Sequence, residues 1–266
     1  MRIVDRFDAF LADIDGTAVS GEKPVARAAA ALKKLRKTGK PLLFVTNNAR
    51  RSAAVWAKHL EKMGIAARPG EIITSATSTA FYIRRRFKNC GDARVFVSGS
   101  AALRSEIRKT GVRIVNHKEA AAGCDAVVIG GHGGFGYADI DTAGRAVRNG
   151  AVFIATNSNF VYPSGDGDFK PATGALAASV EKVAGKKPVI TGKPHPDIFR
   201  ICLKILGSPP ERTAVIGDSM KTDIRGGRRA GVRTVLTLTG ISSRKDLKKF
   251  KYKPDYVIED LSGLFK

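Results

Sequence analysis

The segment Phe10-Leu11-Ala12-Asp13-Ile14-Asp15-Gly16-Thr17 is an apolar run that ends in two acids, a glycine and a threonine. A continuous hydrophobic run is typical of a buried parallel strand, and in open α/β sheets ligands bind beyond the carboxyl ends of the strands. We therefore expect Asp13 and Asp15 to lie at a ligand site. The alternative interpretation is a plain turn, because Asp and Gly are also common where a strand ends.

The rest of the chain alternates apolar runs with helical patterns, which is typical of a mainly parallel sheet with crossover helices. Two further apolar runs, residues 41–45 and 213–217, also lead into polar side chains. The polar side chains that follow them are Thr46, Asn47, Asp218 and Asp223. Because the carboxyl ends of parallel strands share one edge of the sheet, we expect these groups to gather there.

The strand and helix pattern starts again near residue 89 and continues to an alanine-rich helix that ends at residue 184. We therefore predict an α/β fold with two domains. A core with a doubly wound, mainly parallel sheet takes residues 1–88 and 185–266, and an inserted α/β domain takes residues 89–184. Within this division, residues 185–188 are interpreted as a linker and residues 157–168 as a loop.

The chain has no obvious signal for export or for a membrane. Its N-terminus lacks the apolar segment of a secretory signal, and no uncharged run approaches the roughly 20 residues that a membrane span needs. Its three cysteines, Cys90, Cys124 and Cys202, are far apart and form no zinc motif or disulfide framework. We expect a cytoplasmic protein with no membrane partner.

The composition is strongly basic: 46 Lys and Arg against 24 Asp and Glu give a net charge of +22 over 266 residues. Such a field attracts anions, from phosphorylated metabolites to nucleic acid. The cations are scattered, and the chain has neither the basic and aromatic signature of an RNA-binding fold nor a zinc-finger pattern. The sequence therefore disfavours specific nucleic-acid binding.

One glycine-rich segment, Gly131-His132-Gly133-Gly134-Phe135-Gly136, matches the G-x-G-x-x-G pattern of dinucleotide sites. Such a site also needs an acid about 20 residues further on, at the end of the next strand. The strand predicted there ends at Ala155-Thr156-Asn157, which contains no acid. We therefore do not expect a dinucleotide at this segment.

The polar groups expected at the edge of the core sheet combine four acids with one amine. The acids are Asp13, Asp15, Asp218 and Asp223, and the amine is Lys193. Like charges ~4 Å apart repel by about 4 kcal/mol even at an effective dielectric constant of 20, so converging carboxylates need a cation. Ligands that are all oxygen favour a hard ion such as Mg²⁺. Lys193 and Thr46 could then contact a phosphoryl group, which indicates phosphoryl transfer.

Four segments together resemble the motifs of the haloacid dehalogenase superfamily. They are D-x-D-G-T at residues 13–17, the strand-end Thr46, G-K-P at residues 192–194, and G-D-x-x-x-T-D at residues 217–223. The residues of these motifs, and an insert placed after the second motif, are similar to those of the NagD and p-nitrophenyl phosphatase subfamily with its C2-type α/β cap. The resemblance covers nearly the whole chain and implies a Mg²⁺-dependent phosphatase that acts on small phosphorylated metabolites.

The resemblance also implies roles for individual residues. Asp13 would be the nucleophile that forms an aspartyl-phosphate, and Asp15 would be the general acid and base. The implied metal site consists of Asp13, the main-chain carbonyl of Asp15, Asp218 and, from the first or second shell, Asp223. The implied phosphate and substrate contacts are Thr46, Asn47, Lys193 and, in the cap, Tyr162.

Two features qualify what the resemblance implies. Members of the subfamily often dimerise through the cap, so a homodimer is expected. His132 stands where relatives usually carry an aspartate, so substrate preference does not transfer, and the phosphorylated substrate stays open. The alternative function is a basic, nucleic-acid-associated protein on a retained phosphatase scaffold.

Overall fold

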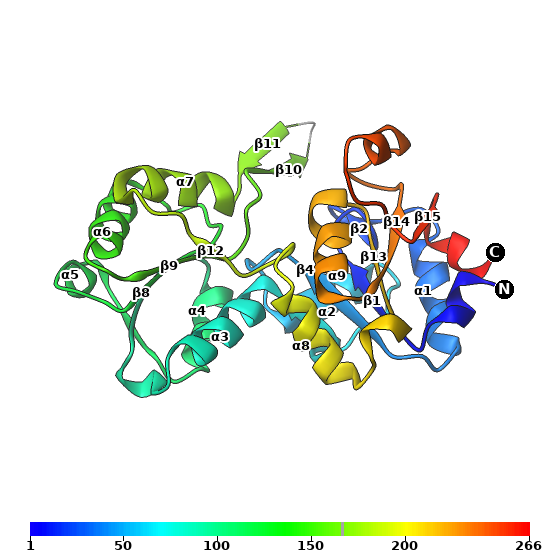
Figure 1. The fold of residues 1–266 in the computed structure, drawn as a ribbon, viewed down its shortest axis with the longest axis horizontal. Helices are drawn as coiled ribbons and strands as arrows, with labels where there is room; N and C mark the ends of the chain where they lie inside the picture. Colours follow the sequence, from blue (N-terminus) through cyan, green and yellow to red (C-terminus); the bar gives the residue numbers. More distant parts are fainter. Residues whose placement is uncertain (166–167) are drawn as a thin grey trace. The chain divides into compact units, whose positions relative to one another are not determined.

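The computed structural model describes residues 1–165 and 168–266 (Figure 1). The chain forms two compact units. The first unit consists of Met1–Thr46, Ala53–Ile73 and Lys193–Lys266, and the second of Asn47–Ser52 and Thr74–Gly192. The second unit therefore extends beyond the insert predicted for residues 89–184, since it also includes residues 74–88 and 185–192.

The first unit is built on a six-stranded sheet in the order β15-β14-β13-β1-β4-β5. The strands are β1 (Ala9–Asp13), β4 (Leu42–Thr46), β5 (Ile72–Thr74), β13 (Thr213–Gly217), β14 (Arg233–Thr237) and β15 (Tyr256–Ile258). Strand β1 pairs in parallel with β4 and β13, and β14 pairs in parallel with β13 and β15. Counted within this unit from β5, the order is 3-2-1-4-5-6, the doubly wound arrangement that reverses between β1 and β13.

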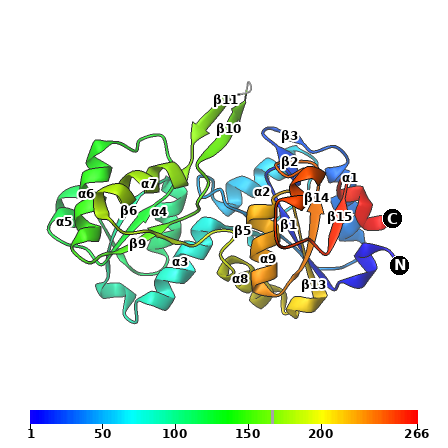
Figure 2. The ribbon, with the colours of Figure 1, turned by 45° about the horizontal axis from the view of Figure 1, so that its top comes forward.

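Helices cover both faces of this sheet, as the alternation of side chains along buried strands requires. The helices are α1 (Ala28–Lys37), α2 (Ala53–Lys62), α8 (Asp197–Leu206) and α9 (Arg225–Ala230). Phe10 packs in a cluster with side chains of α1 and α2, whereas its neighbour Leu11 packs with side chains of α8. Figure 2 shows α8 and α9 on one side of β1 and α1 on the other. A short antiparallel hairpin, β2 (Val19–Ser20) and β3 (Lys23–Pro24), follows β1.

The second unit has its own parallel sheet, in the order β12-β9-β8-β6-β7. Its strands are β6 (Arg94–Ser98), β7 (Arg113–Val115), β8 (Ala126–Ile129), β9 (Val152–Ala155) and β12 (Val189–Ile190). Its helices are α3 (Ser75–Arg86), α4 (Ala101–Arg108), α5 (His117–Ala121), α6 (Tyr137–Arg148) and α7 (Thr173–Ala184). Helices α6 and α7 pack on one face, and α3 and α4 on the other. The predicted α/β class is thus confirmed for both units.

One local prediction for the second unit was wrong. The segment predicted as a loop contains an antiparallel hairpin of β10 (Val161–Gly165) and β11 (Asp168–Pro171), which Figure 1 shows beside α7. Prolines and glycines disfavour strands and concealed this hairpin in the sequence. Residues 185–188, predicted as a linker, are neither helix nor strand and connect α7 to β12, which forms the edge of this sheet beside β9.

Among the residues that the structure describes, no helix is both long enough and apolar enough to cross a membrane.

Candidate functional site

The carboxyl ends of β1 and β13 lie side by side at the point where the strand order of the first unit reverses. Asp13 is the last residue of β1, and Asp218 directly follows β13. Both side chains are buried. Ligands of doubly wound sheets bind in the crevice at this position, so the topology alone places two acids at the expected ligand site.

Lys193 is a buried ammonium that contacts the ends of β1 and β4 and the acid Asp223. Its Nζ donates to Oδ1 of Asp13 at 2.6 Å, to Oδ1 of Asp223 at 2.7 Å and to the carbonyl of Val45 at 3.2 Å. Three donors therefore meet three acceptors in a site where only 3% of the lysine side chain is exposed. Burial opposes the charged form, but the two carboxylates raise the Lys193 pKa above its usual value, so the ammonium keeps its charge.

Three buried carboxylates lie close together at this site, and two of them, Asp13 and Asp223, contact the Lys193 ammonium. Asp13, Asp218 and Asp223 each offer an oxygen, and these atoms all lie within 4.8 Å of one another. Burial, and then repulsion from Asp223, raises the pKa of Asp13 well above its usual value. The same two causes raise the pKa of Asp218 to about 6. When ionised, the three carboxylates carry more negative charge than one ammonium balances, and a donor set made only of carboxylate oxygens fits a hard divalent cation such as Mg²⁺.

Hydrogen bonds fix the orientation of each carboxylate in this cluster. Oδ1 of Asp13 accepts from the amide of Ile14 at 2.8 Å as well as from Lys193. Asp223 accepts from Lys193 at Oδ1, while its Oδ2 accepts from the amide of Ser219 and from the hydroxyl of Thr222, both at 3.2 Å. Both oxygens of Asp223 are thus engaged within the protein.

Asp15 lies outside this group of three. Its side chain is exposed, and its Oδ2 accepts from the hydroxyl of Thr46 at 3.2 Å. Gly16, which follows it, has a φ of +88°, a value that glycine adopts without strain and that turns the chain sharply after β1. The first unit therefore contains six of the predicted site residues, with Asp15 at the solvent side of the buried network.

The other two predicted site residues, Asn47 and Tyr162, belong to the second unit and are described within it. The carbonyl of Asn47 accepts from Oγ of Ser75 at 2.7 Å and from Nδ2 of Asn157 at 3.0 Å. The guanidinium of Arg50 lies 4.9 Å from the centroid of the Tyr162 ring. Residues 166 and 167 of the loop predicted around Tyr162 lie outside the described residues.

Comparison with known proteins is consistent with this geometry. Residues 10–113 match the model of the haloacid dehalogenase-like hydrolases, and residues 190–264 match a second, HAD-hydrolase-like model. The chain belongs to this hydrolase family. Chronophin from Mus musculus is 33% identical over 272 residues, which cover 98% of this chain and 93% of chronophin.

Solved structures of family members also superpose on nearly the whole chain. Glycerol phosphate phosphatase from Mycobacterium tuberculosis, in complex with magnesium, has a TM-score of 0.92 at 33% identity over 99% of this chain and 78% of its own. NagD from Escherichia coli K-12 has a TM-score of 0.87 at 31% identity over 96% of this chain and 97% of its own. The predicted NagD-like resemblance and the predicted enzyme class, a phosphatase of the haloacid dehalogenase-like hydrolase family, are confirmed.

No sequence motif marks one part of the site, the loop of residues 237–242, which starts at the last residue of β14. The amide of Ile241 donates to Oδ2 of Asp218 at 2.7 Å, and the hydroxyl of Thr239 donates to the carbonyl of Gly16 at 2.7 Å. The loop contains no acid, amine or imidazole, so no residue type marked it as chemically active. Its contacts are made by a backbone amide and a hydroxyl, which sequence patterns do not reveal.

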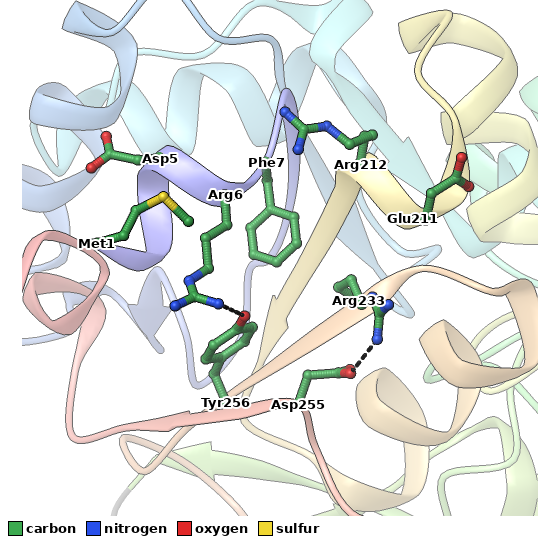
Figure 3. A pocket seen from close by; sticks show the side chains of 9 residues that line it. All are labelled: Met1, Asp5, Arg6, Phe7, Glu211, Arg212, Arg233, Asp255 and Tyr256. Atoms are coloured by element: carbon green, nitrogen blue, oxygen red, sulfur yellow. Dashed lines mark hydrogen bonds and ion pairs between the residues drawn. The ribbon is translucent and has the colours of Figure 1, made fainter.

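A cavity of about 530 Å³ lies at the opposite edge of the core sheet, at the amino ends of its strands (Figure 3). Its lining consists of Met1, Asp5, Arg6, Phe7, Glu211, Arg212, Arg233, Asp255 and Tyr256. Arg233 donates to Asp255 at 3.1 Å, and Arg6 donates to the hydroxyl of Tyr256 at 3.3 Å. This cavity contains none of the family's motif residues, so we place the site at the carboxyl edge.

Proposed function

We propose that this phosphatase hydrolyses small phosphomonoesters with Mg²⁺, through an aspartyl-phosphate formed on Asp13. The observation that carries the proposal is the network in which one buried ammonium, Lys193, holds Asp13 and Asp223 at 2.6 and 2.7 Å. It orients a carboxylate at the strand-order reversal, and it supplies positive charge where a phosphoryl group would bind.

Covalent catalysis by a carboxylate divides the reaction into two displacements. Asp13 attacks the phosphorus, and the bond from phosphorus to the leaving oxygen breaks while Asp15 donates a proton to that oxygen. Water then attacks the phosphorus and gives its proton to Asp15, and the bond between phosphorus and Asp13 breaks. Asp15 suits the exchange of protons because its side chain is exposed and is held by Thr46.

The other predicted site residues would bind the metal ion or the substrate. Asp13, the main-chain carbonyl of Asp15 and Asp218 would hold Mg²⁺, which when bound offsets the negative charge of the carboxylates and of the phosphoryl group. Asp223 has both oxygens engaged and would support the site by positioning Lys193. The substrate contacts proposed beside these are Thr46, Asn47, Lys193 and Tyr162.

The direct test replaces the nucleophile. Asp13→Asn keeps the size of the side chain but removes its nucleophilic carboxylate, so we expect hydrolysis of p-nitrophenyl phosphate with Mg²⁺ to fall by about 10³-fold or more. A matched control is Asp8→Asn. Asp8 is an exposed acid that directly precedes the same strand and forms an ion pair with Arg212. Asp8→Asn should keep the wild-type rate. Substantial turnover by Asp13→Asn would exclude Asp13 as the nucleophile.

A homodimer through the second unit remains a prediction. Light scattering of the purified enzyme would show a mass of twice 28.4 kDa if it is correct.

A further inference from the structure

The loop of residues 237–242 connects two parts of the site that are more than 200 residues apart in sequence. We propose that this loop is a positioning element for divalent-cation binding, which fixes the Asp218 carboxylate and ties it to the turn that follows Asp13. This inference rests on the proposed function, because it assigns the loop to the metal site of that reaction.

The loop first fixes Asp218 itself. Ile241 donates its amide to Oδ2 of Asp218 at 2.7 Å, which fixes the orientation of the carboxylate. The amide of Ser242 donates to the Asp218 carbonyl at 3.0 Å, and the Ser242 hydroxyl accepts from the amide of Met220 at 2.9 Å. Main chain and side chain of Asp218 are therefore held from the same loop.

The loop also holds the turn after β1. The hydroxyl of Thr239 lies 2.7 Å from the Gly16 carbonyl and 3.1 Å from the hydroxyl of Thr237. Because a carbonyl can only accept, Thr239 donates to Gly16, and Thr237 therefore donates to Thr239. This chain of hydroxyls links the end of β14 to the peptide next to the Asp15 carbonyl, which the proposed function assigns to the metal.

Two glycines line the Asp218 carboxylate. A Cβ placed on Gly16 or on Gly240 would overlap the carboxylate group of Asp218. Gly16 also needs its positive φ, but Gly240 does not adopt a positive φ. The backbone at Gly240 would therefore accept an alanine, and the space taken by Asp218 is what requires glycine there. The loop and the carboxylate fit each other closely.

The test measures cation binding directly, by calorimetric titration of each variant with Mg²⁺ in the absence of substrate. Changes to groups that orient metal ligands typically weaken metal affinity by about 10- to 100-fold. We expect a loss in this range for Thr239→Val, which removes the hydroxyl at nearly constant volume, and for Gly240→Ala, which displaces the carboxylate. Thr239→Ser restores the hydroxyl and should restore the affinity.

A matched control lies on the same strand. Thr234 is buried at the other end of β14, and its hydroxyl donates to Asp255 at 2.7 Å. Thr234→Val removes a comparable hydrogen bond and should lower the denaturation midpoint in EDTA without changing Mg²⁺ affinity. A similar loss of affinity in Thr234→Val, or a failure of Thr239→Ser to restore it, would show that the effect is general destabilisation and would overturn the proposal.

Asp218→Asn separates failure of this inference from failure of the proposed function. The inference fails alone if Mg²⁺ binds to the wild type but not to Asp218→Asn, while Thr239→Val and Gly240→Ala bind it with wild-type affinity. The loop would then have no positioning role. If the wild type does not bind Mg²⁺, or Asp218→Asn binds it equally well, the proposed metal site itself is wrong.

Discussion

Lys193 provides the sharpest test at the scale of a residue, because removing it leaves Asp13 and Asp223 buried without their cation. Breaking a buried ion pair by deleting one partner typically costs about 3–5 kcal/mol. We expect Lys193→Met to lower the free energy of unfolding at pH 7 by about this amount, measured by urea denaturation in EDTA. Phosphatase activity should be lost as well.

The loss of stability in Lys193→Met should depend on pH, because the pKa of Asp13 differs between the folded and unfolded states. Without the ammonium, burial keeps the folded-state pKa of Asp13 above its unfolded value of about 3.9. Ionisation then costs stability as the pH rises, so the deficit of Lys193→Met should shrink as the pH falls towards 4. Lys253→Met is the control, because Lys253 donates to the carbonyls of Leu247 and Phe250. A deficit independent of pH would contradict this account of the cluster.

The titratable residues of the site could be predicted because acids and a lysine at strand ends are a visible pattern. Asp13, Asp218 and Lys193 all follow from it, and the structure places them together. Ile241 could not be predicted in this way, since its contribution is a backbone amide that any residue carries. Gly240 was equally hidden, because its role depends on the distance to a side chain 22 positions earlier in the chain.

At the scale of elements, the connection between β8 and α6 contains a histidine that should make stability depend on pH. Nδ1 of His132 accepts from the amide of Gly134 at 3.2 Å, and Nε2 lies 2.8 Å from Oγ of Ser98. The neutral ring with its proton on Nε2 satisfies both contacts. Burial lowers the His132 pKa; Asp139 on α6 opposes this shift, and Arg104 on α4 adds to it.

The folded state therefore binds the His132 proton less readily than the unfolded state. The stability that depends on the neutral ring is fully present above a pH of about 6.5 and decreases as the pH falls towards the lower folded-state pKa. His132→Gln cannot titrate, so the gap in melting temperature between wild type and variant should narrow from pH 7.5 to pH 5.5. A gap that stays constant over this interval would contradict the lowered pKa of His132 in the folded state.

The helices and strands themselves were largely predictable, but which sheet each helix packs against was not. The bounds of the apolar run at residues 213–217, expected as a strand, agree with β13. Helix α3 shows why the domain boundary differed from the one expected. An amphipathic pattern predicts that a helix buries one face, but it does not say which sheet that face packs against. In the structure α3 packs with α4 in a cluster of the second unit.

At the scale of the whole molecule, the net charge of +22 should steer anionic substrates to the enzyme. Salt screens charges over about 10 Å at 0.1 M, so kcat/KM for p-nitrophenyl phosphate should fall several-fold between 20 and 500 mM NaCl, with kcat little changed. Sucrose at equal osmolarity is the control and should have no such effect. Equal values of kcat/KM at both salt concentrations would show that the field does not act on the substrate.

The same charge also separates the proposed phosphatase from the alternative of a nucleic-acid-associated protein. Weak electrostatic binding to duplex DNA should disappear near physiological salt in a gel-shift titration. A complex that persists there, with a salt dependence that corresponds to several phosphate contacts, would instead favour the alternative.

The covalent intermediate on Asp13 is tested most directly by trapping it. Borohydride reduces an acyl phosphate to an alcohol, so adding it during turnover of p-nitrophenyl phosphate with Mg²⁺ should convert Asp13 to homoserine. Peptide mass spectrometry would locate that change. We expect homoserine at position 13 only when both substrate and Mg²⁺ are present; homoserine at another acid, or an unmodified Asp13 in an enzyme that was turning over, would contradict the proposed mechanism.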